Sequence, residues 1–228
     1  AGDIFNVPFL LNTHELMRRA TAPGSTVRGP IDRAMIDKGA RPLWWQPYGL
    51  TLIMLYEGVA RRPADLNGLK IRTFGKAHEA FINTLGGAAT NISGSRQFLA
   101  YERGTVDGGM TGPLTIKDRK LYQVLESAAL TNHAVIEFVV LINERLWQGL
   151  SDTDRAVLTA AAIAVEADLR DRFPALAAAA TTVRTSAAAA TTDPTLAAAA
   201  ATDIILVSDF TLTPPRLPDR RFHRYECG

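Results

Sequence analysis

Residues 69–92 read LKIRTFGKAHEAFINTLGGAATNI, and this stretch decides the fold class. Leu69 to Thr73 is a short run that favours a strand. Lys76 to Leu85 carries apolar side chains at helical spacing, and Gly86-Gly87 then ends the helix. Ala88 to Ile92 predicts a second strand. A strand, a helix and a strand in close succession predict a parallel βαβ unit.

The same alternation continues toward the C-terminus. Ser95 to Arg103 predicts a helix that Gly104 stops, and Val106 marks a short strand. Leu114 to Leu125 predicts a helix, and the apolar run from Phe138 to Ile142 is typical of a buried strand. The chain is therefore expected to form an α/β fold with mostly parallel sheets that helices cover on both faces.

The N-terminal part is less regular. His14 to Ala20 and Pro30 to Lys38 predict short helices. Two strands are expected at residues 43–45 and 51–56, separated by Pro47 and Gly49, which interrupt the β pattern.

The region after residue 150 predicts one long helix. Ser151 to Asp154 resembles a capping box, and Pro174 is a place for a kink. From Ala175 to Thr202 the chain is nearly all Ala and Thr, whereas exposed helices normally carry more Lys and Glu. This predicts either a low-complexity helical tail or, as we favour, small residues standing in for the true sequence. A strand is expected at residues 204–210.

Composition excludes several classes of protein. The chain has 228 residues, enough for one large domain or two lobes, with 25 Lys+Arg against 23 Asp+Glu. No strong field therefore attracts nucleic acid or anionic lipid. The single cysteine, Cys227, excludes a disulfide framework and a cysteine-rich metal site. Apolar runs are too short to span a bilayer, and we expect any export signal to have been removed or never present.

Catalytic motifs are absent from the sequence. It contains no G-x-S-x-G, H-E-x-x-H, G-x-x-x-x-G-K-[ST] or G-x-G-x-x-G. His14, His78, His133 and His223 show no metal-ligand spacing. We therefore expect no catalytic residue, no metal and no cofactor.

Arg72 is the strongest candidate for binding a ligand. It ends a predicted strand just before a helix, and ligands of open α/β sheets lie at the carboxyl ends of strands. A helix N-terminus favours an anion there, and a guanidinium holds a carboxylate by two parallel hydrogen bonds. The alternative is an exposed arginine that lies over the sheet edge.

Other candidates have plain structural alternatives. Ser93 and Ser95 precede a helix, where capping is the commoner role. Asp107-Gly108-Gly109 is a turn signal. Trp44, Trp45 and Tyr48 form either an aromatic wall or part of the core. Asn132-His133 lies where the chain is expected to cross between lobes.

The stretch from Pro63 to Arg72, PADLNGLKIR, resembles the P-x-D-L-K-G-L-K-I-R segment of DctP-like TRAP solute receptors. LAYERGTVDG at 99–108 resembles their A-L-Q-x-G-x-V-D-G. Further matching pieces follow the family's order and spacing as far as Ser151: Leu85 to Ala88, Leu121 to Val124, Thr131 to His133, Leu141 to Asn143, and Leu150-Ser151.

The resemblance implies a periplasmic-binding-protein-like receptor with two lobes and a long helix that crosses both. One lobe would comprise residues 1–47 and 134–228, and the other residues 48–133. The implied location is the periplasm. The implied partners are a small organic acid and the membrane subunits of a TRAP transporter, with neither nucleic acid nor enzyme activity.

In the family, the arginine that matches Arg72 clamps the ligand carboxylate, a role that suits this side chain. With this resemblance, seven residues are expected around the ligand: Arg72, Phe74, Ser93, Thr111, Asn132, His133 and Trp45.

Three departures from the family pattern bear on the ligand. The β/α portion that usually precedes the segment matching Asp3 is not found in this sequence. A second basic residue often follows the glycine matching Gly49, where this chain has Leu50 and Thr51. The family's D-G-Q-E-N-P is replaced by residues 107–112, DGGMTG. Fewer charges imply one carboxylate on a more apolar ligand body.

Two other functions remain open at this point. An enzyme acting on a small carboxylic acid would need a general base, for which Glu57, Asp107 or His133 are candidates outside any motif. A ligand-sensing domain would need a DNA-binding or signalling module, and the sequence contains no such pattern.

Overall fold

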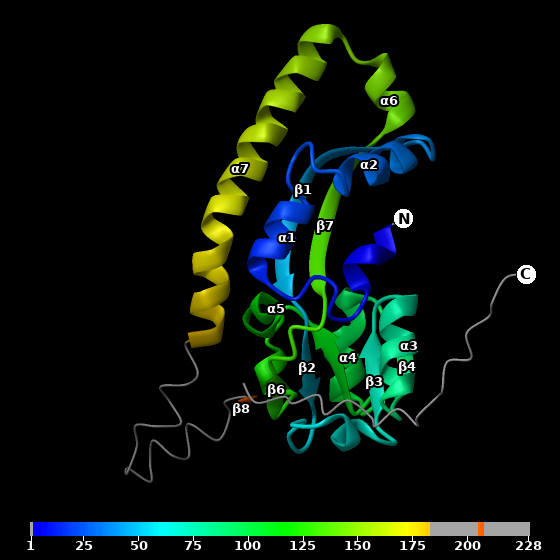
Figure 1. Cartoon of the computed structure of the whole chain (residues 1–228), viewed down its shortest axis with the longest axis vertical. Coiled ribbons are helices and arrows are strands. Elements are labelled where there is room, and N and C mark those ends of the chain that lie inside the picture. The colour runs from blue at the N-terminus through cyan, green and yellow to red at the C-terminus, as the bar shows by residue number, and fades with distance from the viewer. Residues whose placement is uncertain (1, 183–204, 208–228) are drawn as a thin grey trace, which may run out of the picture.

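The computed structural model describes residues 2–182 and 205–207. The chain forms two lobes, an antiparallel ribbon and a larger open sheet, with one long helix beside them (Figure 1). The ribbon consists of β1 (Ala40–Leu50) and β7 (Val135–Asn143). Helix α7 (Asp152–Thr182) packs on β1 and on α5 (Pro113–Asp118) of the larger lobe. The expected two-lobe α/β fold with a lobe-spanning helix is therefore confirmed.

The larger lobe is built on a six-stranded sheet in the order β4-β3-β5-β2-β6-β8. Three of its strand pairs are parallel and two are antiparallel, so the sheet is mixed and mostly parallel, as expected. Its strands are β2 (Leu52–Leu55), β3 (Lys70–Thr73), β4 (Ala88–Asn91), β5 (Gly108–Thr111), β6 (Ser127–Ala129) and β8 (Ile205–Val207). Its helices are α3 (Lys76–Thr84) and α4 (Gln97–Glu102), with 3-10 turns η2 (Pro63–Leu66), η3 (Gly94–Arg96) and η4 (Leu121–Gln123).

Central strand β2 explains why this sheet is buried on both sides. Leu52 and Met54 enter an apolar cluster with Tyr101, whereas Ile53 and Leu55 enter another on the opposite face. Successive side chains of a strand point to opposite faces, so four consecutive apolar residues are buried at once.

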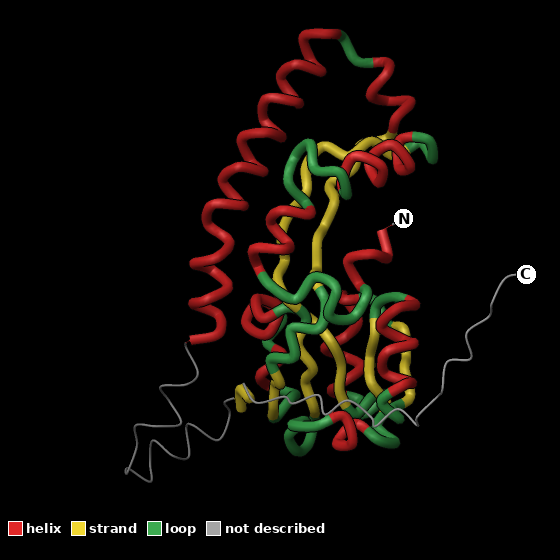
Figure 2. The backbone as a smooth tube through the Cα atoms, viewed as in Figure 1, coloured by secondary structure: helices red, strands yellow, loops and turns green. Residues whose placement is uncertain are grey.

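The smaller lobe carries the N-terminal helices. It contains η1 (Gly2–Asn6), α1 (His14–Ala20), α2 (Arg28–Ile36) and α6 (Glu144–Gly149). Figure 2 shows these helices gathered around the ribbon. The two predicted N-terminal helices and the cap of the long helix are confirmed, the latter by a hydrogen bond from the Asp154 N–H to the Ser151 hydroxyl. The expected C-terminal strand is confirmed at β8, whereas residues 183–202 of the Ala/Thr segment lie outside the described residues.

The prediction of two strands separated at Pro47 and Gly49 was wrong. β1 runs through both residues to Leu50 and pairs with β7 along its length. The register shifts between Pro42 and Trp44 and again between Pro47 and Gly49. Such irregularities let a strand accommodate a proline, which lacks the N–H of a regular ladder.

Residues 107–109 were also predicted wrongly, since Gly108 and Gly109 open strand β5 instead of forming a turn. A Cβ on Gly108 would collide with the Met54 carbonyl oxygen, and one on Gly109 with the Tyr101 hydroxyl. These two glycines allow neighbouring groups to pack closely against the strand, and they do not form a turn.

Two further expectations need correction. The helix expected over residues 114–125 ends at Asp118, because Lys120 adopts a left-handed conformation with φ 53° before η4. β7 is not fully buried: Phe138 and Leu141 are each 46% exposed. Its only partner among the described strands is β1, so one face of this ribbon lacks the cover that a parallel sheet would have.

The chain crosses between the lobes at two points that are bonded to each other. Thr51 separates β1 from β2, and its N–H and hydroxyl both donate to the Ala134 carbonyl oxygen, at 2.8 and 2.9 Å. The Thr131 hydroxyl donates to the Thr51 carbonyl oxygen at 3.2 Å. The two crossings are thus joined to each other by hydrogen bonds.

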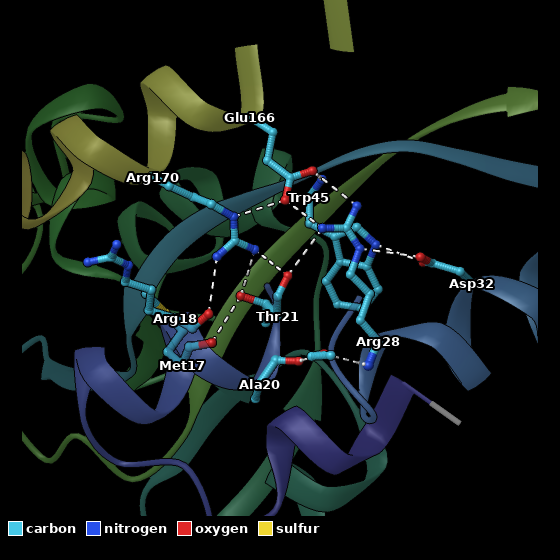
Figure 3. A network of polar contacts seen from close by, with 10 residues as sticks. Met17, Arg18, Ala20, Thr21, Arg28, Asp32, Trp45, Glu166 and Arg170 are labelled. Atoms are coloured by element: carbon cyan, nitrogen blue, oxygen red, sulfur yellow. Dashed lines mark hydrogen bonds and ion pairs between the residues drawn. The ribbon is translucent and has the colours of Figure 1, made fainter. Parts of the chain in front are cut away.

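Helix α7 is held on the smaller lobe by a buried ionic network (Figure 3). The Glu166 carboxylate accepts hydrogen bonds from both Nη atoms of Arg28, at 2.5 and 3.0 Å, and from Nε of Arg170 at 2.9 Å. The Trp45 N–H donates to it at 3.2 Å. Burial opposes ionisation of Glu166, but the bonds from Arg28 and Arg170 outweigh it and lower its pKa.

Glu137 on β7 lies beside this network. It lines a small cavity of about 100 Å³ together with Thr21 and Arg170. Burial raises the pKa of Glu137 to about 7, although the Thr21 hydroxyl and the charge of Arg170 act in the opposite direction. The folded chain therefore retains a proton on this group between pH 4.5 and about 7, where the unfolded chain has lost it.

We expect Glu137→Gln to stabilise the protein at pH 8 but not at pH 4.5. The stability that Glu137 contributes is fully present below its unfolded pKa and is lost as the pH rises through about 7. An amide avoids the buried charge, so the gain in unfolding free energy at pH 8 is up to ~3 kcal/mol. Urea denaturation at both pH values measures it, with the exposed Glu102→Gln as matched control. An equal gain at both pH values would contradict the assignment.

Candidate ligand-binding site

A cleft of about 370 Å³ lies between the ribbon and the larger sheet. The larger lobe contributes residues at the carboxyl ends of β3, β4 and β5, which point to one edge of the sheet because these strands are parallel. The ribbon contributes the opposite wall. The lining residues are Tyr48, Ile136 and Phe138 from the ribbon, and Arg72, Phe74, Ser93, Gly94, Ser95, Gln97, Thr111, Thr115 and Arg119 from the larger lobe.

Arg72 is fixed by its surroundings. It is only 4% exposed, Nε donates to the Ile92 carbonyl oxygen at 2.7 Å, and Nη1 donates to the Met110 carbonyl oxygen at 2.6 Å. The guanidinium carbon lies 5.0 Å from the centre of the Phe74 ring. No hydrogen bond of Nη2 is found among the described residues. The side chain is thus held rigidly in the cleft wall, with donor capacity remaining for a ligand.

Tyr101 and Gly109 form the support beneath Arg72. A Cβ on Gly109 would lie 2.8 Å from Cβ of Arg72 and would strike the Tyr101 hydroxyl, so the three residues are in close contact. Burial raises the pKa of Tyr101. Burial lowers the pKa of Arg72, and the like charge of Arg119 acts in the same direction. A guanidinium nevertheless stays protonated in proteins.

The ribbon wall is aromatic. The rings of Tyr48 and Phe138 meet edge to face with centroids 4.6 Å apart. The Tyr48 hydroxyl accepts a hydrogen bond from the Thr115 hydroxyl at 2.6 Å, which joins the two walls. Opposite, the hydroxyls of Ser93 and Ser95 are hydrogen-bonded to each other at 3.1 Å. The cleft therefore combines an apolar wall with a wall of hydroxyls and guanidinium groups.

Four of the seven residues expected around the ligand line the cleft: Arg72, Phe74, Ser93 and Thr111. Trp45, Asn132 and His133 do not. Trp45 packs in the smaller lobe, where its indole N–H donates to Asp32 at 2.9 Å. Asn132 is exposed, with φ 46°.

His133 belongs to the core at the crossing between the lobes. It is fully buried, its Nδ1 is hydrogen-bonded to the Thr131 hydroxyl at 2.6 Å, and its ring stacks on Phe81 at 4.8 Å. Burial, together with the charge interaction with nearby His78, lowers its pKa to about 3. His133 is thus a neutral structural residue in this position.

Tyr48 and Ser95 were candidates with structural alternatives, and sequence reasoning did not place the other cleft residues. Phe138 was expected in a buried strand, and Thr115 and Arg119 in a long helix. Only the ends of the parallel strands carried a signal, because their position follows from the βαβ pattern. Tyr48, Ile136 and Phe138 lie on the ribbon and line the cleft only because the ribbon faces the larger sheet. The sequence pattern does not show how the two lobes face each other.

The electrostatics of the cleft favour an anion. Arg72 and Arg119 are its two charged residues, and no Asp or Glu is found among the described residues that line it. The described part of the chain contains no group of three or more His, Cys, Asp or Glu side chains placed to hold a metal ion. The arrangement can pair a small anion with a guanidinium while an apolar wall covers its body.

None of the described helices is long and apolar enough to cross a membrane.

Comparison with known proteins identifies the family of the chain. The sequence model of the family described as bacterial extracellular solute-binding protein, family 7 (DctP), matches residues 1–197. The sialic acid-binding periplasmic protein SiaP of Vibrio cholerae is 37% identical over 95 residues, which is 41% of this chain and 30% of that protein. The C4-dicarboxylate-binding periplasmic protein DctP of Rhodobacter capsulatus is 26% identical over 65% of this chain and 44% of its own. The chain thus matches less than half the length of these two relatives.

Solved structures agree on the fold. A TRAP periplasmic solute binding protein from Polaromonas sp. JS666, bound to D-erythronate, superimposes with a TM-score of 0.77 at 25% identity. The match covers 91% of this chain and 63% of that one. A TRAP periplasmic solute binding protein from Pseudomonas aeruginosa with bound L-malate gives a TM-score of 0.75 at 21% identity, covering 90% of this chain and 67% of that one.

Proposed function

Because the chain belongs to the DctP family of bacterial extracellular solute-binding proteins, we propose that it is the solute receptor of a TRAP transporter. It captures a small organic acid by its carboxylate in the cleft between the lobes and delivers the acid to the transporter's membrane subunits. The proposed location is the periplasm, the compartment given in the names of its relatives. Solved relatives that bind D-erythronate and L-malate support an organic acid as the ligand.

The observation that carries this proposal is the state of Arg72. A guanidinium that is 4% exposed lines the cleft, yet no carboxylate among the described residues pairs with it. A charge that has lost its water needs a partner, and a ligand carboxylate supplies one. Nη1 and Nη2 remain the donors for that carboxylate, since Nε is occupied by Ile92.

The lining also favours a receptor over an enzyme. Glu57, Asp107 and His133, the general bases considered from the sequence, are not among the residues that line the cleft. Acid–base catalysis needs such a group within hydrogen-bonding distance of the reacting atom. We therefore propose that the cleft binds its ligand without converting it.

We propose that the chain changes lobe at Thr51 and near Ala134, close to the boundaries of residues 1–47, 48–133 and 134–228 and to hinges near Tyr48-Gly49 and His133-Ala134. Strand β8, from the last of these segments, returns to the larger sheet. The hydrogen bonds between Thr51 and Ala134 support this placement, because they join the two crossings at one point. Rotation about these segments would close the cleft around a ligand.

Native mass spectrometry of gently purified protein tests the proposal directly. We expect a co-purified acid of low mass that is released on denaturation and can be weighed. Small-angle scattering with this acid added back is then expected to show compaction, because the lobes close on the ligand. The protein after denaturation and refolding without the acid is the matched control. An unchanged radius of gyration at saturation, or failure to bind any carboxylic acid, would count against a receptor.

A further inference from the structure

Arg119 is the second charged residue of the cleft, and no sequence pattern predicted it there. It follows the short helix α5, and its backbone N–H closes that helix by donating to the Thr115 carbonyl oxygen at 3.0 Å. Its guanidinium lies against the loop between β4 and α4. A Cβ on Gly94 would be only 2.5 Å from Nη1 of Arg119. The absence of a side chain at residue 94 thus leaves the space that this guanidinium occupies.

The two arginines lie against the same loop but come from different elements. Arg72 donates to the Ile92 carbonyl oxygen, and Arg119 lies over Gly94 two residues later. Both side chains line the same cleft. Among the described residues, no ion pair or hydrogen bond of the Arg119 side chain is found. Two neighbouring cations repel each other, and an anion between them would remove that repulsion.

An ordinary surface arginine would extend into water and pair with a nearby acid. Arg119 is half-buried, and the cleft contains no acid among its described lining. Arg119 therefore faces the ligand space with its donors available. A guanidinium prefers oxygen acceptors, either a carboxylate or a hydroxyl, and binds a carboxylate more strongly.

We propose that Arg119 is the specificity-determining residue of the cleft and that it selects acids with a second oxygen-bearing group. Arg72 holds the first carboxylate, and Arg119 holds a carboxylate or hydroxyl at the other end of the ligand. This inference rests on the proposed function and refines it. It replaces the expectation of a single carboxylate on an apolar body, because Arg119, just after α5, supplies a second cation where residues 50 and 51 supply none.

Three acids with the same four-carbon chain test this role. Butyrate has no second group, 4-hydroxybutyrate has a hydroxyl and succinate has a second carboxylate. Calorimetric titration of the wild-type protein is expected to show at least about tenfold tighter binding of succinate than of butyrate. The affinity for 4-hydroxybutyrate shows what Arg119 requires. An affinity close to that of succinate means that any oxygen acceptor suffices, and one close to that of butyrate means that a charged group is needed.

The variant Arg119→Met keeps the apolar stem and removes the donors. We expect it to lose the preference for succinate over butyrate, while Arg119→Lys retains part of that preference. Arg103→Met is the matched control, because Arg103 is exposed, lies outside the cleft lining and changes the net charge equally. The affinities of Arg103→Met for the three acids are expected to equal those of the wild-type protein.

The outcomes separate this inference from the proposed function. An undiminished preference for succinate in Arg119→Met overturns the role of Arg119, as does an equal loss for all three acids. Equal affinity of the wild-type protein for the three acids overturns it too, and leaves a receptor for monocarboxylates. A wild-type protein that binds no acid of any chain length overturns both.

Discussion

Arg72→Ala is expected to weaken the binding of a carboxylate ligand by roughly 30-fold to several thousand-fold. Truncating one partner of a buried charge pair costs ~2–5 kcal/mol, and each ~1.4 kcal/mol is tenfold in affinity. The ligand carboxylate would be left in a cleft without its partner. Calorimetric titration with the most tightly bound acid of the butyrate and succinate series measures the loss. Wild-type affinity in this variant would remove Arg72 from the site.

The control for this experiment must detect a change in folding. An arginine that only faced a wet cleft would contribute little to stability, but the Arg72 side chain donates hydrogen bonds to the carbonyl oxygens of Ile92 and Met110. A carbonyl oxygen that loses its donor in this buried position costs about 1–3 kcal/mol. Arg72→Lys keeps the charge and loses the two-pronged geometry, so it should bind clearly worse with less destabilisation. Thermal melts of both variants, beside Arg103→Ala, separate lost binding from lost fold.

Glu166→Ala is expected to destabilise the protein by about 3–5 kcal/mol. The substitution leaves the buried guanidinium groups of Arg28 and Arg170 without their shared carboxylate. It also removes the acceptor of the Trp45 N–H, so the bond between α7 and β1 is lost at the same time. Urea denaturation at pH 7 measures the change in unfolding free energy.

Helix α7 contains its own matched control. Asp168 and Arg172 form an ion pair of the same i, i+4 spacing, with side chains 56% and 64% exposed. Asp168→Ala is expected to change stability by less than ~1 kcal/mol, since exposed pairs are screened by water. If both substitutions cost the same, the Glu166 network does not anchor the helix. Replacing Arg28, Glu166 and Arg170 together by Met should recover part of the loss, because no unpaired charge remains buried.

The sequence predicted those parts of the fold that local signals determine. β3, α3 and β4 follow from apolar spacing and from the glycines that end the helix, and these elements also place Arg72 at the sheet edge. The short strand expected at Val106 begins only at Gly108, as β5, and its position was misjudged because glycines have no strand preference of their own. Gly108 and Gly109 are required by Met54 and Tyr101, which come from other parts of the chain.

The candidate site was predicted only in part for the same reason. Phe74, Ser93 and Thr111 were expected from the family resemblance, and they line the cleft because they lie at or just after the ends of the parallel strands β3, β4 and β5. Trp45 and His133 were misplaced, since an aromatic residue beside a predicted crossing is equally suited to a core. Arg119 had no detectable signal, because its position depends on where α5 ends and on the lack of a side chain at Gly94.

The close contact beneath Arg72 determines how this cleft can acquire a new ligand by mutation. Gly109, Tyr101 and Arg72 leave one another no spare volume, so any side chain at residue 109 displaces the anchor itself. These three residues therefore cannot be substituted one at a time without disturbing Arg72. The wall residues differ: Thr111, Gln97 and Phe138 touch the ligand space without holding the anchor. A library of variants intended to redirect the receptor toward another acid should therefore vary the wall residues and keep Arg72, Tyr101 and Gly109 unchanged.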